Sequence, residues 1–186
     1  MLLFVGLGNP TPDSENNRHN VGFKIIDVLN KKFSLSKQKP KFKGLLTTGN
    51  IENEKVYAIK PLTFMNNSGI CIRELIEYFK IDPEDVIVFH DDLDIEFGKI
   101  KAKFGGSSAG HNGIASIDKF IGKDYSRVRI GIGKPKGNIE IGDYVLQNFE
   151  EEEIDGINKI SDNIIESISI LIQKKLDLFS STVNNK

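Results

Sequence analysis

Short apolar runs alternate along this chain with longer segments of helical periodicity, and this alternation restricts the fold more than any other feature. The strand-like runs lie at Leu2–Val5, Leu45–Thr48, Val56–Ile59, Val86–Phe89, Ile100–Phe104 and Val128–Ile132. Helical spacing of apolar residues marks Val21–Phe33, Ile72–Phe79, the region near Ile114–Ile121, and a long stripe from about Glu150 to Ile172. Strands alternating with helices are typical of α/β proteins. The sequence therefore predicts a three-layer α/β/α domain around a mixed, twisted sheet.

The organisation of the strands makes the expectation more specific. The bare apolar run "VIVF" suits a strand that is buried on both faces. The second and third runs are joined through "GNIENEK", which predicts an antiparallel hairpin. No repeat or linker divides the chain of 186 residues, so we expect one domain over residues 1–180. The ending "SSTVNNK" carries no pattern, and residues 181–186 are expected to form a flexible tail.

Composition narrows the class of protein. No apolar run approaches the roughly eighteen residues of a membrane span, so no membrane partner is expected. The opening "MLLFVGLGNP" has no basic residue before its apolar part, which favours a first strand over a secretory signal. Cys71 is the only cysteine. A chain with no internal disulfide is typical of a reducing cytoplasm.

Charge is balanced overall but unevenly distributed. The net charge is -1, although residues 150–155 contain a dense acidic block. Basic residues alternate elsewhere, at Lys99, Lys101 and Lys103 and again at Arg127 and Arg129. Residues two apart on a strand share a face, so each set forms a one-sided basic stripe. A solvated surface and a phosphate contact explain such a stripe equally well.

Three familiar motifs are incomplete in this chain. Gly6 and Gly8 follow a strand, but Thr11 occupies the third glycine position of a dinucleotide loop. "GIGKPKG" lacks the ending of a phosphate-binding loop. "GSSAG" resembles a nucleophile elbow around Ser108, yet the only later histidine is His111, with no acid between them. A flexible glycine-rich loop describes this segment better.

Polar residues instead gather where strands pass into loops or helices. They are Asn9, His19, Asn66, His90, Asp91 and Asn112. Any single Asn here could be a helix cap or a turn residue, and Asp91 could be either as well. Loops at the carboxyl ends of strands converge on one crevice in open α/β sheets. Their placement in equivalent loops therefore predicts one pocket with an imidazole, a carboxylate and three amides.

The residue types of this pocket indicate the kind of reaction it could catalyse. A neutral imidazole can act on water as a general base, and a carboxylate behind it fixes its tautomer and stabilises the imidazolium. Amides can grip a carbonyl or an oxyanion. The set indicates a hydrolase of an ester or an amide. The rival is a metal site built from the three histidines with Asp91 and Asp92, but the usual short ligand spacings are absent.

Six sequence blocks carry a resemblance to a known family. They are "VGLGNP", "RHNVG", "PLTFMNNSG", "HDDLDIEFG", "GGSSAGHNG" and "RVRIGIGKP". In this order and spacing they resemble bacterial peptidyl-tRNA hydrolase, over residues 1 to about 150. The resemblance implies a monomeric, cofactor-free and metal-free cytoplasmic esterase. Its substrate would be peptidyl-tRNA, cleaved between the peptide and the 3′-terminal ribose.

The resemblance also implies roles for individual residues. His19 would activate water and Asp91 would stabilise its imidazolium, while Asn9 would contact the peptide. The positions implied for substrate binding are Asn66, Asn112, Phe64, Met65, Lys101, Lys103 and Arg129. The last three would contact phosphates, which gives the basic stripes a partner.

The chain departs from the family pattern at four positions. Thr11 replaces a glycine, Ser14 a tyrosine and Asn17 a threonine beside the implied base, and Ala109 replaces a glycine before Asn112. Ser14 can supply only the hydroxyl function of the tyrosine in substrate binding. The base and the acid are retained.

Two other functions stay open. A non-catalytic RNA-binding module could share this fold, although RNA binding alone requires neither His19 nor Asp91. A metal-dependent hydrolase is the third possibility.

Overall fold

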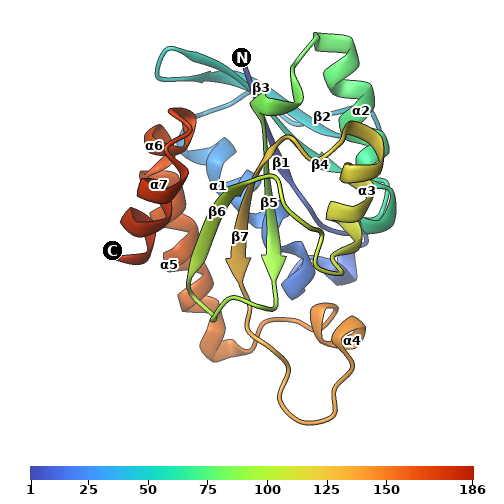
Figure 1. Cartoon of the computed structure of the whole chain (residues 1–186), viewed down its shortest axis with the longest axis vertical. Coiled ribbons are helices and arrows are strands. Elements are labelled where there is room, and N and C mark those ends of the chain that lie inside the picture. Colours follow the sequence, from blue (N-terminus) through green and yellow to red (C-terminus); the bar gives the residue numbers. More distant parts are fainter.

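The computed structural model describes all residues, 1–186, as one seven-stranded sheet between two layers of helices (Figure 1). The strand order is β2-β3-β4-β1-β5-β7-β6. The four central strands are parallel: β4 (Glu54–Pro61), β1 (Leu2–Gly6), β5 (Val86–Asp92) and β7 (Ser126–Gly131). The outer strands β2 (Lys39–Lys41), β3 (Gly44–Ile51) and β6 (Ile100–Phe104) pair antiparallel. This mixed sheet confirms the predicted α/β class.

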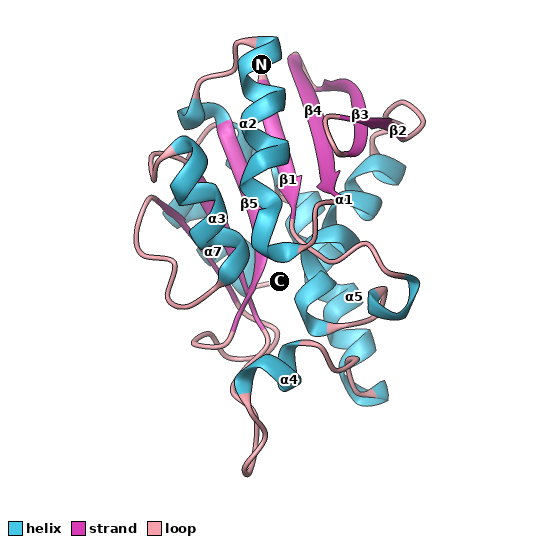
Figure 2. Cartoon of the chain, turned by 90° about the vertical axis from the view of Figure 1, so that its right-hand side faces the viewer, coloured by secondary structure: helices cyan, strands magenta, loops and turns pink.

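Helices cover both faces of the sheet. One layer holds α1 (Val21–Lys32), α5 (Glu151–Glu166), α6 (Ile168–Ile172) and α7 (Leu176–Asn184), and the other holds α2 (Ser68–Phe79) and α3 (Asn112–Ile121). The short α4 (Ile141–Val145) lies below both layers, beyond the sheet (Figure 2). None of the helices combines the length and the apolar character that a membrane span requires.

Burial on both faces of the sheet explains why the central strands are continuous apolar runs in the sequence. Along β1, Leu2 and Phe4 belong to the core beneath α1 and α5, while Leu3 and Val5 belong to the core beneath α2 and α3. Both faces of the strand are therefore buried, as in parallel sheets generally. The same holds for β5, which confirms the prediction made from "VIVF".

Most predicted elements are present, with two differences. The edge strand β2 consists of Lys39, Pro40 and Lys41, all exposed, so it has no hydrophobic signal. The long C-terminal stripe is divided at Ser167 into α5 and α6. Ile164, Ile168 and Leu171 are nevertheless all buried in one core, which confirms this part of the stripe. The prediction is wrong for Ile154 at its start, which is 43% exposed.

The expected flexible tail is wrong for residues up to Asn184, because α7 continues through them. Val183 is buried. The side-chain amide of Asn184 accepts from the Ile100 N–H and donates to the Ile100 carbonyl, both at 2.9 Å. Ser180 Oγ accepts from the Ala102 N–H at 2.8 Å. Side chains of α7 thus occupy the open edge of β6, which the sequence pattern alone did not reveal.

Close packing of glycine backbone fixes the start of α1 against the sheet. A Cβ on Gly22 would lie 2.4 Å from the Leu7 nitrogen and from the Phe89 oxygen. A Cβ on Gly6 would lie 2.2 Å from the Gly22 oxygen. Only glycine permits this approach, and it brings the turn that precedes α1 to the carboxyl ends of β1 and β5.

Candidate active site

Two adjoining hollows lie at the carboxyl edge of the parallel strands. The first, of about 570 Å³, is lined by His19, Asp91, Asp92, Leu93, Asp94, Ser108, Ala109, Gly110, His111, Asn112, Lys134, Pro135, Ile141, Gly142 and Val145. The second, of about 380 Å³, is lined by Asn9, Thr11, Ser14, His19, Phe64, Met65, Asn66, Asn112, Gly142, Val145 and Leu146. Four residues belong to both, namely His19, Asn112, Gly142 and Val145. The loops therefore converge as the polar residues at the strand ends predicted, although His90 lines neither hollow.

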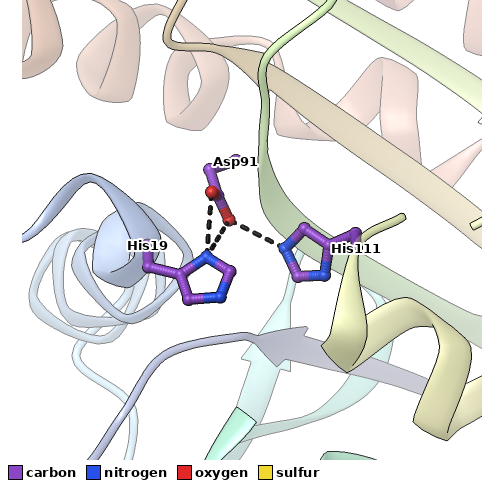
Figure 3. A group of neighbouring side chains, drawn as sticks. All are labelled: His19, Asp91 and His111. Carbon is purple, nitrogen blue, oxygen red and sulfur yellow. Dashed lines mark hydrogen bonds and ion pairs between the residues drawn. The ribbon is translucent and has the colours of Figure 1, made fainter. Parts of the chain in front are cut away.

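His19 lies in the 3-10 turn η2 (Arg18–Asn20), immediately before α1. Its Nδ1 lies 2.9 Å and 3.0 Å from the two Asp91 carboxylate oxygens (Figure 3). Asp91 is the last buried residue of β5 and is 2% exposed. A carboxylate cannot donate, so neutral His19 carries its proton on Nδ1. Its Nε2 makes no hydrogen bond within the protein and is free to accept a proton.

His111 is a third member of this network, although its sequence position suggested only a metal ligand. Its Nε2 lies 2.8 Å from Asp91 Oδ1. Its Nδ1 accepts from the N–H groups of Gly113 and Ile114 at the start of α3. His111 is thus the N-cap of α3, a position where Asn, Asp, Ser or Thr is usual. The sequence signal was the histidine directly before the helical pattern in "GHNG".

The Asp91 carboxylate is ionised because two ring N–H groups point at it. Burial raises its pKa, but His111 and His19 outweigh burial and hold the pKa of Asp91 well below its usual range. The two backbone donors on His111 Nδ1 leave the proton of the neutral ring on Nε2. The tautomers of both histidines are therefore set by their partners and not by the solvent.

His90 is buried behind the network. Its Nδ1 donates to the Asp91 carbonyl at 2.8 Å, and its Nε2 has no partner. Its ring meets the His111 ring edge-on, with centroids 4.9 Å apart. Burial, followed by the neighbouring His111, lowers the pKa of His90 to about 3. His90 is therefore a neutral structural residue at ordinary pH.

The second hollow is organised around Asn9. Asn9 Oδ1 accepts from the Met65 N–H at 2.9 Å, which leaves its Nδ2 group without a partner in the protein. Asn20 holds the Asn9 backbone from the other side, because its amide bonds both the N–H and the carbonyl of Asn9 at 2.9 Å. Residue 20 belongs to the same turn as His19. His19 and the Asn9 amide are thus fixed relative to each other.

The wall beside Asn9 contains a strained residue. Phe64 has φ of 61° and is 54% exposed, while Met65 is buried. A positive φ in a bulky residue costs about 1–3 kcal/mol and persists only where the surroundings hold it. The bond from Met65 to Asn9 provides that restraint. It leaves an aromatic ring standing at the rim of the hollow.

Asn66 and Asn112 are not caps, although capping was an open explanation for any Asn here. Asn112 follows the N-cap of α3, and Asn66 lies within the 3-10 turn η3 (Met65–Asn67). Neither side-chain amide makes a hydrogen bond within the protein, and both residues line the second hollow. Their donors and acceptors are available to a ligand.

Two of the departures from the family pattern contact each other. Thr11 Oγ1 lies 2.7 Å from Ser14 Oγ, and the Ser14 N–H donates to the Thr11 carbonyl at 2.9 Å. Ser14 is buried and lines the second hollow. Thr11 and Ser14 therefore form a compact turn at the wall of the second hollow.

The basic residues of β6 and β7 separate into different environments. Lys101 is exposed and Lys103 half-buried, and their strand partners are Arg129 and Arg127 respectively. Arg129 Nε bonds Asp92 Oδ2 at 2.7 Å. Arg127 is 2% exposed and is held by Asp118 at 2.9 Å. The predicted stripe is therefore wrong for Arg127, because an acidic partner on α3 draws its side chain inward.

A metal ion could be considered only at the network itself. The ligand atoms of His19, Asp91 and His111 lie within 4.8 Å of one another. Metal binding through His111 Nε2 would require that nitrogen to lose its proton. Its other nitrogen cannot take the proton without breaking the two backbone hydrogen bonds. The donor set fits a proton-handling network better than a cation.

Comparison with known proteins identifies the family of this chain. The family model for peptidyl-tRNA hydrolase matches residues 3–186. The chain is 81% identical over 186 residues to the peptidyl-tRNA hydrolase of Pelagibacter ubique, covering all of both chains. It is 43% identical over 183 residues to that of Ehrlichia canis, covering 98% of this chain and 94% of the relative.

The fold gives the same result. The crystal structure of peptidyl-tRNA hydrolase from Acinetobacter baumannii superposes with a TM-score of 0.92 at 34% identity. The match covers 99% of this chain and 94% of that one. This chain belongs to the peptidyl-tRNA hydrolase family.

Proposed function

We propose that this protein hydrolyses the ester bond between the peptide and the 3′-terminal ribose of peptidyl-tRNA, with His19 as general base on water. The single observation that carries the proposal is the state of His19. Asp91 holds its Nδ1–H, and its free Nε2 lies at the junction of two hollows. If one arm of the ester occupies each hollow, the scissile bond lies at their junction, beside His19 Nε2.

The reaction follows from this arrangement. Nε2 takes a proton from water as the oxygen attacks the acyl carbon, and the imidazolium that forms is stabilised by Asp91. The negative charge that develops on the carbonyl oxygen needs donors. The unbonded amides of Asn112 and Asn66 supply them. The proton then passes from His19 to the departing ribose oxygen, which completes the hydrolysis.

The peptide arm fits the second hollow. The free Nδ2 group of Asn9 can donate to a peptide carbonyl, and Phe64 and Met65 offer apolar surface beside it. Thr11 and Ser14 form the opposite wall. A blocked α-amino group is uncharged, so a hollow whose polar groups are amides and hydroxyls favours it over a free ammonium, which would need a carboxylate there.

The RNA arm is supported by the basic face. Lys101 and Lys103 make no hydrogen bond within the protein, so they are available to phosphates. Arg129 already bonds Asp92 through Nε, and only its terminal amino groups remain for a phosphate. Contacts of this kind position RNA without reading its sequence. A general tRNA substrate requires that property.

No metal ion is needed in this proposal. The N-cap bonds on His111 direct its Nε2–H at Asp91, so His111 shares the carboxylate with His19 and keeps it in place. Neither a cofactor nor a partner subunit contributes to the steps above. We expect the protein to act as a monomer in the cytoplasm.

A direct assay tests the function. N-acetylaminoacyl-tRNA and unblocked aminoacyl-tRNA are incubated with the protein, each with and without a chelator, and free tRNA is measured. We expect release from the blocked substrate only, unchanged by the chelator. Binding of tRNA without release would favour the non-catalytic RNA-binding module, and loss of activity with chelator would favour a metal-dependent enzyme.

A further inference from the structure

A buried cation lies beside His19 but takes no part in the network around Asp91. Arg18 is 3% exposed. Its Nη2 bonds Glu153 Oε1 at 2.9 Å, and its Nη1 donates to the Tyr144 carbonyl at 3.3 Å. Its guanidinium also lies 4.1 Å from the centroid of the Tyr144 ring. One residue of the His19 turn therefore binds both α4 and the first turn of α5.

The α4 segment has few other attachments. Between residues 134 and 148 only Tyr144 and Val145 are buried. The Tyr144 hydroxyl donates to the Ile132 carbonyl at 2.8 Å. The other anchors are an exposed ion pair between Lys134 and Asp94, the small apolar cluster that Tyr144 and Val145 form with Ile132, and two backbone bonds. These bonds run from Arg18 N–H to the Gln147 carbonyl and from Phe149 N–H to the Asn16 carbonyl. Arg18 is thus the charged side chain that holds α4 to the turn containing His19.

The restrained segment forms part of both hollows. Gly142 and Val145 line each of them, Ile141 lines the first and Leu146 the second. None of these side chains carries a group that could transfer a proton or donate a hydrogen bond. Through its side chains the segment can therefore contribute to substrate binding but not to the chemical step.

We infer that Arg18 is a positioning residue, which holds α4 at a fixed distance from His19 and so sets the width of the substrate hollows. The inference rests on the proposed function, since it concerns the same site. His19 itself is held independently, by Asp91 and by the Asn20–Asn9 pair. Loss of the Arg18 guanidinium should therefore affect substrate binding and leave the base in place.

The test separates KM from kcat. In Arg18→Met, which keeps side-chain length and apolar contact, we expect KM for N-acetylaminoacyl-tRNA to rise about tenfold, since that is the effect of losing one good contact. We expect kcat to stay within about twofold and the acidic limb of its pH profile to stay in place, because the interactions lost are not specific to the transition state. Arg18→Lys retains the charge but not the planar fork, so its KM should lie between those of the wild-type chain and Arg18→Met.

Hydrogen exchange supplies a readout that needs no activity. The amides of residues 140–150 should exchange faster in Arg18→Met, while those of β5 keep their protection. Arg73→Met is the matched control, because Arg73 pairs only with Glu77 on the exposed side of α2 and should change neither measurement. If Arg18→Met does not fold, the same kinetic and exchange measurements are made on Arg18→Lys and Tyr144→Leu.

Unchanged KM together with unchanged exchange would overturn the inference. A fall in kcat at normal KM would overturn it too, since that result indicates lost folded enzyme or a displaced base. Failure of the wild-type chain to hydrolyse the substrate would instead refute the proposed function. The exchange experiment would still test, in that case, whether Arg18 holds α4 in place.

Discussion

The network around Asp91 and the basic face of β6 and β7 are built in opposite ways on one sheet. His19, Asp91 and His111 come from distant segments, are buried or nearly so, and share one carboxylate. Lys101 and Lys103 come from a single strand and point from its surface without partners in the protein. The first region depends on the position of single atoms, whereas the second depends on summed charge. Substitutions should therefore have large, non-additive effects in the network and small, additive effects on the basic face.

The largest effect is expected for His19→Ala. General-base catalysis contributes about 10²–10⁴-fold, so kcat should fall by that order while tRNA binding stays near normal. Single-turnover hydrolysis and a filter-binding titration measure the two quantities. Turnover close to the wild-type rate would remove the distinction between the regions, because the base would then contribute no more than a surface charge.

Asp91→Asn should have the next largest effect, on the order of 10²-fold in kcat, because an amide has no negative charge to stabilise the imidazolium and its NH₂ group favours the wrong tautomer of His19. Losing the carboxylate also disfavours the imidazolium, so the acidic limb of the rate–pH profile should move to lower pH. Asp94→Asn is a matched control at the rim of the first hollow. An identical profile in Asp91→Asn would exclude Asp91 from its proposed role.

His90 links the network to folding stability. Because its pKa is lowered to about 3, the unfolded chain binds a proton between that value and about 6.5, where the folded protein does not. Folding stability should therefore fall as pH drops below about 6.5, by about 2 kcal/mol between pH 7 and pH 5 from this residue. His90→Asn should flatten that slope in urea unfolding measured at both pH values.

The assignment of this pH dependence of folding stability to His90 can be tested separately. If His90→Asn keeps the wild-type pH dependence, another group is responsible. The depressed pKa of Asp91 acts at lower pH, since its contribution to stability is lost only as pH falls below the ordinary carboxyl range. The two effects are therefore separable by the pH at which stability changes.

The smallest effect belongs to the basic face. Lys103→Ala should weaken tRNA binding a few-fold and reduce the slope of log affinity against log salt by about one unit. The double variant with Lys101→Ala should reduce it by about two, with kcat unchanged at saturating substrate. Lys55→Ala, which removes an exposed lysine at the start of β4, is the control. An unchanged slope would mean that the stripe is solvated surface.

Part of the site follows from particular residues of the sequence alone. Asn9, His19, Asn66, Asp91 and Asn112 each follow a strand or precede a helix, and loops at one edge of a parallel sheet meet. Local pattern and topology suffice for that inference. The pairing of His111 with Asp91 was missed because a contact over 20 residues leaves no periodic trace. The bond between Arg18 and Glu153 joins residues 135 positions apart and could not be predicted for the same reason.

The alternation of strands and helices, the burial of β1 and β5, and the family could all be predicted from the sequence, because they depend on local periodicity and on residues in fixed order. Only the folded molecule shows which atoms share the Asp91 carboxylate, that Arg127 turns inward to Asp118, and that α7 covers the edge of β6. Each of these depends on a distance between segments far apart in the chain. Such distances are set by how the layers pack, and hydrophobic pattern does not encode them.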